Sequence, residues 1–93
     1  MKLDPITKLP TKEHELKVWP TFYGPLKRGE KPFEVRVNDR SYQRGETLYL
    51  REWDPDTKTY TGESCRKLIT YTLSGWGVSP GHIAMGLRDL ENV

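Results

Sequence analysis

Short runs in which apolar and polar residues alternate recur along the chain and constrain its fold more than any other feature. The clearest run covers residues 33–38, where Phe33, Val35 and Val37 share one face of a strand and are therefore expected to be buried. Further runs of this kind are found at residues 14–19, 47–53, 65–73 and 83–87. The same period predicts burial of Leu48, Leu50, Ile69, Leu73, Ile83, Met85 and Leu87. A chain of 93 residues is too short for two full sheets. The pattern therefore predicts a mainly β (α+β) fold, a small β-barrel of five or six short strands.

One short helix is expected between the first two strands, at residues 20–28. Phe22, Tyr23 and Leu26 recur at helical spacing, and Gly29 suits the end of the helix. Gly24-Pro25 interrupts this stretch, so we expect one or two irregular turns. Residues 1–13 show no period and are interpreted as a flexible N-terminal arm. Residues 14–93 are then a single domain.

Composition excludes several classes of protein. The single cysteine, Cys65, rules out an intrachain disulfide and a cysteine-based zinc site, and the two histidines are far apart in sequence. We therefore expect neither a metal nor another cofactor. No apolar run approaches the length of a membrane span, and no signal-peptide pattern is present, so a cytoplasmic protein is expected. A net charge of +2 decides nothing about partners.

Charged residues concentrate between positions 27 and 51. This segment holds seven lysines and arginines against four acids, an excess of +3. Glu34 and Arg36 project from one face of a strand about 7 Å apart, and Lys31 precedes them. A solvated strand face with a surface ion pair is the more common explanation of such a pattern. The strands expected at residues 47–53 and 65–73 are predicted to pair as a hairpin. Aromatic residues are interleaved with the cations, as in single-stranded nucleic-acid sites, although they also suit a hydrophobic cover on this hairpin. They are Tyr42, Tyr49 and Trp53.

The motif Gly29-x-Lys31-x-x-Glu34-x-Arg36 resembles the signature of the ASCH domain, a branch of the PUA-like superfamily. With Asn38-Asp39-Arg40 and Tyr60-Thr61-Gly62 further on, residues 14–90 are similar to a small ASCH-like family of unknown function found in bacteria and phages. The resemblance implies a PUA-like barrel with a helix between the first two strands. It also implies a ligand cleft between the barrel and that helix, lined by the motif.

Three functions remain open. The first is a module that binds nucleic acid, single-stranded RNA above all, or a modified nucleotide. Its expected binding residues are Lys31, Glu34, Arg36, Asn38, Asp39, Arg40 and Tyr42. The second is a small hydrolase of a nucleoside amide or RNA phosphodiester, with Lys31 and Glu34 as catalytic pair and His14 as a possible third member. Related amidohydrolases carry a threonine nucleophile where this chain has Glu34, which argues against that activity. The third is a bacterial or phage protein-interaction module anchored by tryptophans, namely Trp19, Trp53 and Trp76.

Overall fold

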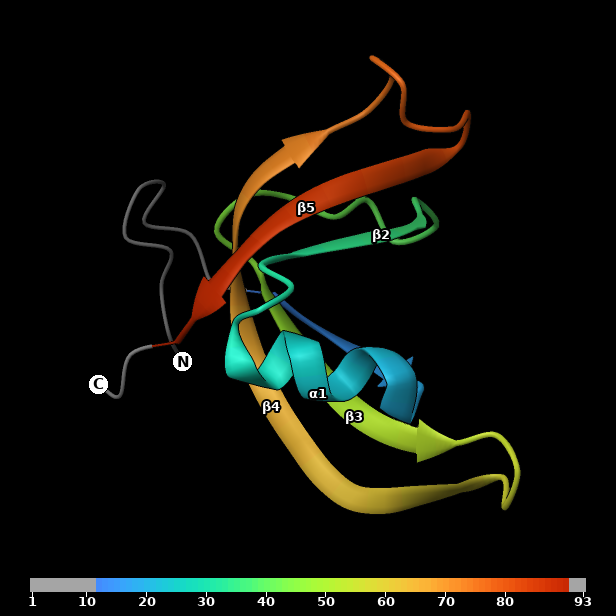
Figure 1. Cartoon of the computed structure of the whole chain (residues 1–93). Helices are drawn as coiled ribbons and strands as arrows, with labels where there is room; N and C mark the ends of the chain where they lie inside the picture. Colours follow the sequence, from blue (N-terminus) through green and yellow to red (C-terminus); the bar gives the residue numbers. More distant parts are fainter. Residues whose placement is uncertain (1–11, 91–93) are drawn as a thin grey trace.

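The computed structural model describes residues 12–90, which form five strands and one helix. In chain order these are β1 (Glu13–Val18), α1 (Pro20–Arg28), β2 (Phe33–Val37), β3 (Thr47–Asp54), β4 (Thr59–Leu73) and β5 (His82–Asp89) (Figure 1). The mainly β fold with one short helix between the first two strands is thus confirmed. The expected N-terminal arm lies almost entirely outside the described residues, and its last residue, Glu13, belongs to β1.

The five strands make one sheet in the order β1-β3-β4-β5-β2. β1 runs parallel to β3, and the other three neighbouring pairs are antiparallel. The expected hairpin of β3 and β4 turns at Asp54, whose side-chain oxygen accepts the backbone N–H of Asp56 at 2.8 Å. The sheet curls into a half barrel (Figure 1). It does not close by strand pairing, because β1 and β2 stand at its two ends.

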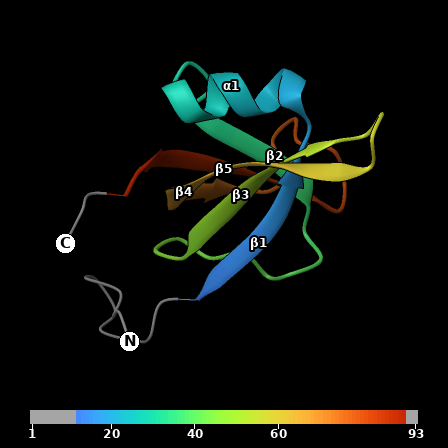
Figure 2. The same cartoon turned by 90° about the horizontal axis from the view of Figure 1, so that it is seen from below.

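Helix α1 lies along one side of the curled sheet (Figure 2). Pro20 occupies the start of the helix, where a missing N–H costs no hydrogen bond, and Gly29 ends it with φ 82°. The nine residues form a continuous α-helix, so the expectation of irregular turns was wrong. The bond that Pro25 omits would reach Thr21 in the exposed first turn, where water can take its place. Among the described residues, no helix has the length and apolar character needed to cross a bilayer.

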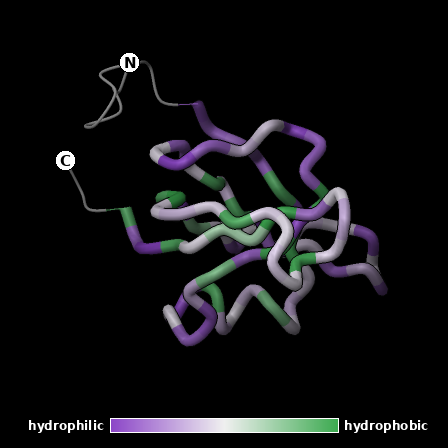
Figure 3. Tube along the Cα trace, turned by 90° about the horizontal axis from the view of Figure 1, so that it is seen from above, coloured by the Kyte–Doolittle hydropathy of each residue, from purple (hydrophilic) through white to green (hydrophobic). Residues whose placement is uncertain are grey.

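The core lies inside the curl, between the sheet and α1. Hydrophobic and polar stretches alternate along the strands (Figure 3), as expected for a sheet with one buried face. The buried apolar side chains are Leu16, Val18, Tyr23, Leu26, Tyr42, Leu48, Leu50, Ile69, Ile83, Met85 and Leu87. Of the residues predicted to be buried on β3, β4 and β5, only Leu73 is half-buried.

Strand β2 is inverted relative to the sequence prediction. Phe33, Val35 and Val37 are 48%, 47% and 55% exposed, whereas Glu34 is 5% exposed. The predicted alternation along β2 is confirmed, but the prediction of which face is buried was wrong. Glu34 pairs with the fully buried Met85 on β5, so it faces the interior of the half barrel. β2 is the last strand of the sheet, and its inner face looks into the opening beside β1, where cations can neutralise the buried carboxylate.

Two arginine side chains bridge this opening. Arg36 on β2 donates from Nη2 to the backbone carbonyl of Lys17 at 2.8 Å. Arg40, just after β2, donates from Nη1 to the carbonyl of Glu15 at 2.7 Å. Both carbonyls belong to β1, on the edge that faces away from β3. These arginine side chains therefore donate to backbone carbonyl groups that, in a closed barrel, would accept hydrogen bonds from a neighbouring strand.

Candidate functional site

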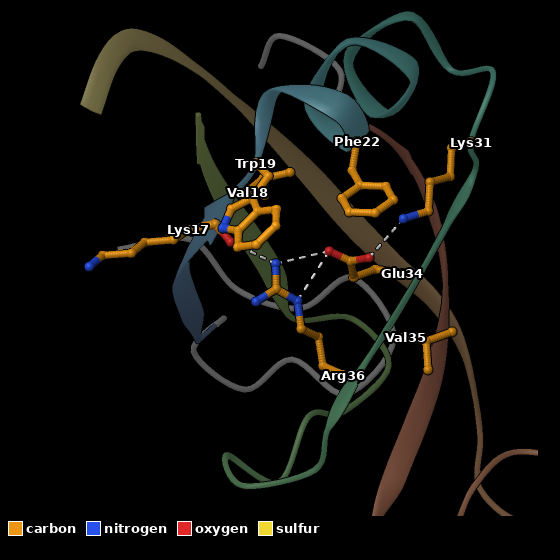
Figure 4. Close-up of a pocket in the computed structure, with 8 residues that line it drawn as sticks. All are labelled: Lys17, Val18, Trp19, Phe22, Lys31, Glu34, Val35 and Arg36. Carbon is orange, nitrogen blue, oxygen red and sulfur yellow. Dashed lines mark hydrogen bonds and ion pairs between the residues drawn. The ribbon is translucent and has the colours of Figure 1, made fainter. Parts of the chain in front are cut away.

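A cleft of about 380 Å³ opens between the end of β1, the first turn of α1 and the inner face of β2. Its lining comes from one continuous stretch of the chain, residues 17–36: Lys17, Val18, Trp19, Phe22, Lys31, Glu34, Val35 and Arg36 (Figure 4). Three charged residues that the motif singled out, Lys31, Glu34 and Arg36, are therefore brought together in one cavity. Its volume falls within the range of small-molecule sites.

Glu34 is the centre of the cleft and lies between two cations (Figure 4). Lys31 Nζ donates to Oε1 of Glu34 at 3.1 Å. Arg36 donates to Oε2 from both Nε, at 3.1 Å, and Nη2, at 3.0 Å. The Glu34 side chain is 7% exposed, while those of Lys31 and Arg36 are 22% and 28% exposed. A buried charge needs such partners, because burial without them costs several kcal/mol, about the stability of a small domain.

The cluster keeps donors that the protein does not use. Two positive charges against one negative charge leave an excess of +1. Among the described residues, Arg36 Nη1 has no hydrogen-bond partner. Lys31 has three N–H bonds, of which one is directed at Glu34. The cleft therefore offers hydrogen-bond donors and net positive charge, which suit a ligand with anionic or carbonyl oxygens.

Aromatic side chains form the wall opposite these charges. Trp19 is 53% exposed and Phe22 is 48% exposed, and both point toward the charged cluster (Figure 4). Lys31 Nζ lies 4.8 Å from the centre of the Phe22 ring. The sequence analysis did not assign Phe22 to the site and considered Trp19 only as a protein anchor. One signal was available: Phe22 and Tyr23 are adjacent on the helix and about 100° apart around its axis, so they cannot both point at the same part of the sheet.

Four other residues expected at the site lie elsewhere. Asn38 and Asp39 are exposed beyond the end of β2 and do not line the cleft. Arg40 bonds to the backbone of β1. Tyr42 is 3% exposed and packs edge-on against the His14 ring, with centroids 4.6 Å apart. Burial raises the pKa of Tyr42. Its ring belongs to the core and has no free face on which a base could stack.

His14 is also a structural residue. It is 3% exposed, and its Nε2 lies 2.8 Å from a carboxylate oxygen of Glu46. The same oxygen accepts the backbone N–H of Gln43 at 2.8 Å, so this pair fixes the connection before β3. His14 does not line the cleft. Within residues 12–90, no three His, Cys, Asp or Glu side chains gather closely enough to hold a metal ion.

The three tryptophans do not share one flat surface. Trp19 borders the cleft, and Trp53 is half-buried beneath Lys17, whose Nζ lies 4.7 Å from its ring centre. Trp76 is 92% exposed in the loop between β4 and β5. Of the three tryptophans, only Trp19 lines the cleft.

Comparison with known proteins places this chain in a family. A family model described as "Domain of unknown function (DUF3850)" matches residues 13–87, from β1 into β5. The chain is also similar to the "Uncharacterized 12.9 kDa protein in GpA 3'region" of Escherichia phage P2, with 37% identity over 67 residues. That match covers 70% of this chain and 60% of the phage protein. The chain belongs to the family described as Domain of unknown function (DUF3850).

Proposed function

We propose that this protein binds RNA or a modified nucleotide, and that one nucleotide enters the cleft formed by Lys31, Glu34 and Arg36. The observation that carries the proposal is the inversion of β2. Glu34 is buried, while three apolar side chains of the same strand are about half exposed. The opposite orientation would bury more apolar surface and desolvate fewer charges. A chain that departs from this rule commonly does so at a functional site.

Each part of the cleft has a role in this proposal. Arg36 Nη1 and the free N–H bonds of Lys31 donate to a phosphate or to carbonyl oxygens of a base. Glu34 holds both cations in place, and its remaining lone pairs accept from an exocyclic amine. Trp19 and Phe22 supply aromatic surface on which the base stacks. The cleft volume limits the part of the ligand inside the cleft to about one nucleotide.

The proposal includes the likeness to ASCH and PUA-like domains drawn from the motif. The helix after the first strand and the cleft beside it support this part of the proposal. The protein would act in the cytoplasm, where the thiol of Cys65 stays free.

A binding panel tests the proposal. The ligands are the four ribonucleoside 5′-monophosphates, N4-acetylcytidine and a random-sequence RNA octamer, titrated by calorimetry. Lys31→Gln removes a charged donor worth about 1.5–3 kcal/mol, so affinity should fall about 10- to 150-fold. Lys27→Gln is the matched control, because Lys27 lies on the same helix-to-strand segment but does not line the cleft. Equal losses in the two variants, or no binding by any ligand, would refute the proposal.

One observation favours the hydrolase alternative: Lys31 Nζ and Glu34 Oε1 lie 3.1 Å apart within the cleft, close enough to act as an acid–base pair. The same samples decide between the two functions when they are analysed by chromatography after incubation. We expect N4-acetylcytidine and the octamer to be recovered intact. If N4-acetylcytidine or the octamer is hydrolysed, and Glu34→Gln abolishes this hydrolysis, the protein is an enzyme and not a binding module.

A further inference from the structure

The outer face of β1, β3 and β4 carries aromatic rings that are each covered by a cation. Arg51 lies 3.7 Å from the Tyr60 ring centre, Arg66 lies 4.1 Å from that of Tyr49, and Lys17 lies 4.7 Å from that of Trp53. We call these six residues the aromatic–basic face: Lys17, Tyr49, Arg51, Trp53, Tyr60 and Arg66. These pairs bring positive charge and aromatic surface together on one face of three strands.

Strand register brings these residues together. Lys17 pairs with Arg51 across β1 and β3, and Tyr49 pairs with Arg66 across β3 and β4. Trp53 pairs with Tyr60 at the end of the same hairpin. Leu16 and Val18 on β1 and Leu48 and Leu50 on β3 point into the core. Lys17, Tyr49 and Arg51 alternate with them and therefore lie on the solvent side of the sheet. Trp53 lies on the same side, because its ring is in contact with Lys17.

Lys17 connects this face to the cleft. Its backbone carbonyl accepts a hydrogen bond from Arg36 inside the cleft. Its side chain points away from the cleft (Figure 4) and lies over Trp53. A molecule that leaves the cleft past Lys17 therefore meets Trp53 first and Tyr60 next, since Lys17 Nζ is 5.9 Å from the Tyr60 ring centre.

The charges on this face favour an anionic chain. Two acids lie there, and each is paired: Glu15 accepts from Arg51 at 3.2 Å, and Glu13 accepts from Arg66 at 2.9 Å. Lys17 has no carboxylate partner among the described residues. Three cations and two acids leave an excess of +1, located next to the cleft.

We propose that the ligand is a single strand of RNA several nucleotides long, which continues from the cleft across the aromatic–basic face. Lys17 moves from the Trp53 ring to the phosphate that follows the nucleotide in the cleft, and Arg51 moves from the Tyr60 ring to the next phosphate. The next bases take their places on Trp53 and Tyr60. This inference rests on the proposed function of the cleft and extends it from one nucleotide to a strand. Cations beside aromatic rings are the usual composition of sites that bind single strands.

Two titrations separate this inference from the proposal on the cleft. A fluorescein-labelled random-sequence RNA octamer is titrated by fluorescence anisotropy, and the monophosphate that binds tightest is titrated by calorimetry. Tyr60→Leu should weaken octamer binding about fivefold or more, the lower limit for loss of one base stack, and leave monophosphate binding within twofold. Lys17→Gln should also weaken octamer binding and lower the slope of log affinity against log salt by about 0.7.

Matched controls come from outside the aromatic–basic face. Tyr71 is an exposed tyrosine at the other end of β4, and Lys27 is an exposed cation on α1. Tyr71→Leu and Lys27→Gln should leave octamer affinity within twofold. The proposal of an extended site is wrong if the octamer binds no tighter than the monophosphate, or if Tyr60→Leu and Lys17→Gln lose no more octamer affinity than the controls. Neither result contradicts the proposal that a nucleotide binds in the cleft. If Lys31→Gln leaves monophosphate binding unchanged, the proposal on the cleft fails separately.

Discussion

Replacing Glu34 by glutamine removes the one negative charge between Lys31 and Arg36 and keeps the shape of the side chain. Breaking a fully buried ion pair costs about 3–5 kcal/mol. Here the two cations keep 22% and 28% of their side-chain surface exposed, and the amide oxygen still accepts one hydrogen bond. The expected loss in the free energy of unfolding is therefore about 2 kcal/mol, less than for full burial. For a domain of this size it corresponds to a fall in Tm of about 8–16 °C.

A triple variant tests whether the three charged residues stabilise the fold or serve ligand binding. Lys31→Met, Glu34→Leu and Arg36→Met together replace the whole cluster by apolar side chains of similar volume. Such replacements are often neutral or stabilising by about 1–4 kcal/mol. The triple variant should therefore match or exceed the Tm of the native protein and lose nucleotide binding.

Thermal and urea unfolding followed by circular dichroism measure both effects. Glu30→Gln is the control, because Glu30 is an exposed acid paired with Arg28 outside the cleft, and its Tm should not change. A triple variant less stable than Glu34→Gln alone would refute the reasoning. The charged cluster would then hold the half barrel together, and the inverted strand would be no evidence of function.

Three further outcomes follow from burial. Leu50→Ala should lower the free energy of unfolding by about 2–5 kcal/mol in urea titrations, whereas Val37→Thr, on the exposed face of β2, should change it by less than about 0.5 kcal/mol. Glu46→Ala leaves buried His14 without its partner and should cost about 1–3 kcal/mol in the same assay. Burial raises the pKa of the Cys65 thiol, so iodoacetamide at pH 8 should alkylate the native protein more slowly than the urea-unfolded protein, as followed by mass spectrometry.

Local patterns were sufficient to predict the elements of this fold. Alternation located all five strands, and the proline and glycine around residues 20–29 bounded the helix. The sheet topology was not accessible in this way. The parallel pairing of β1 with β3 joins segments that are about thirty residues apart, and a period of two is the same for every neighbour a strand could have.

The motif also identified residues that lie together, because Lys31, Glu34 and Arg36 line one cleft, the candidate site. It failed on orientation: the hydrophobic pattern of β2 favours burial of Val35, and only the cations beside Glu34 make the opposite face suitable for the interior. Tyr42 was misassigned for a related reason. A tyrosine among cations suits a binding surface as well as a core, and its contact with His14 depends on a β1–β3 packing that the sequence does not reveal.

The most direct test of the account is an NMR titration of the ¹⁵N-labelled protein with a ribonucleoside monophosphate. The chain has three tryptophans, whose indole N–H signals report on three separate places. The account predicts saturable shifts of the Trp19 indole and of the Arg36 Nε–H, with the Trp76 indole unchanged, because Trp19 and Arg36 line the cleft and Trp76 does not. Saturable shifts at Trp76 with Trp19 and Arg36 unchanged would contradict the central claim that the ligand binds in the cleft.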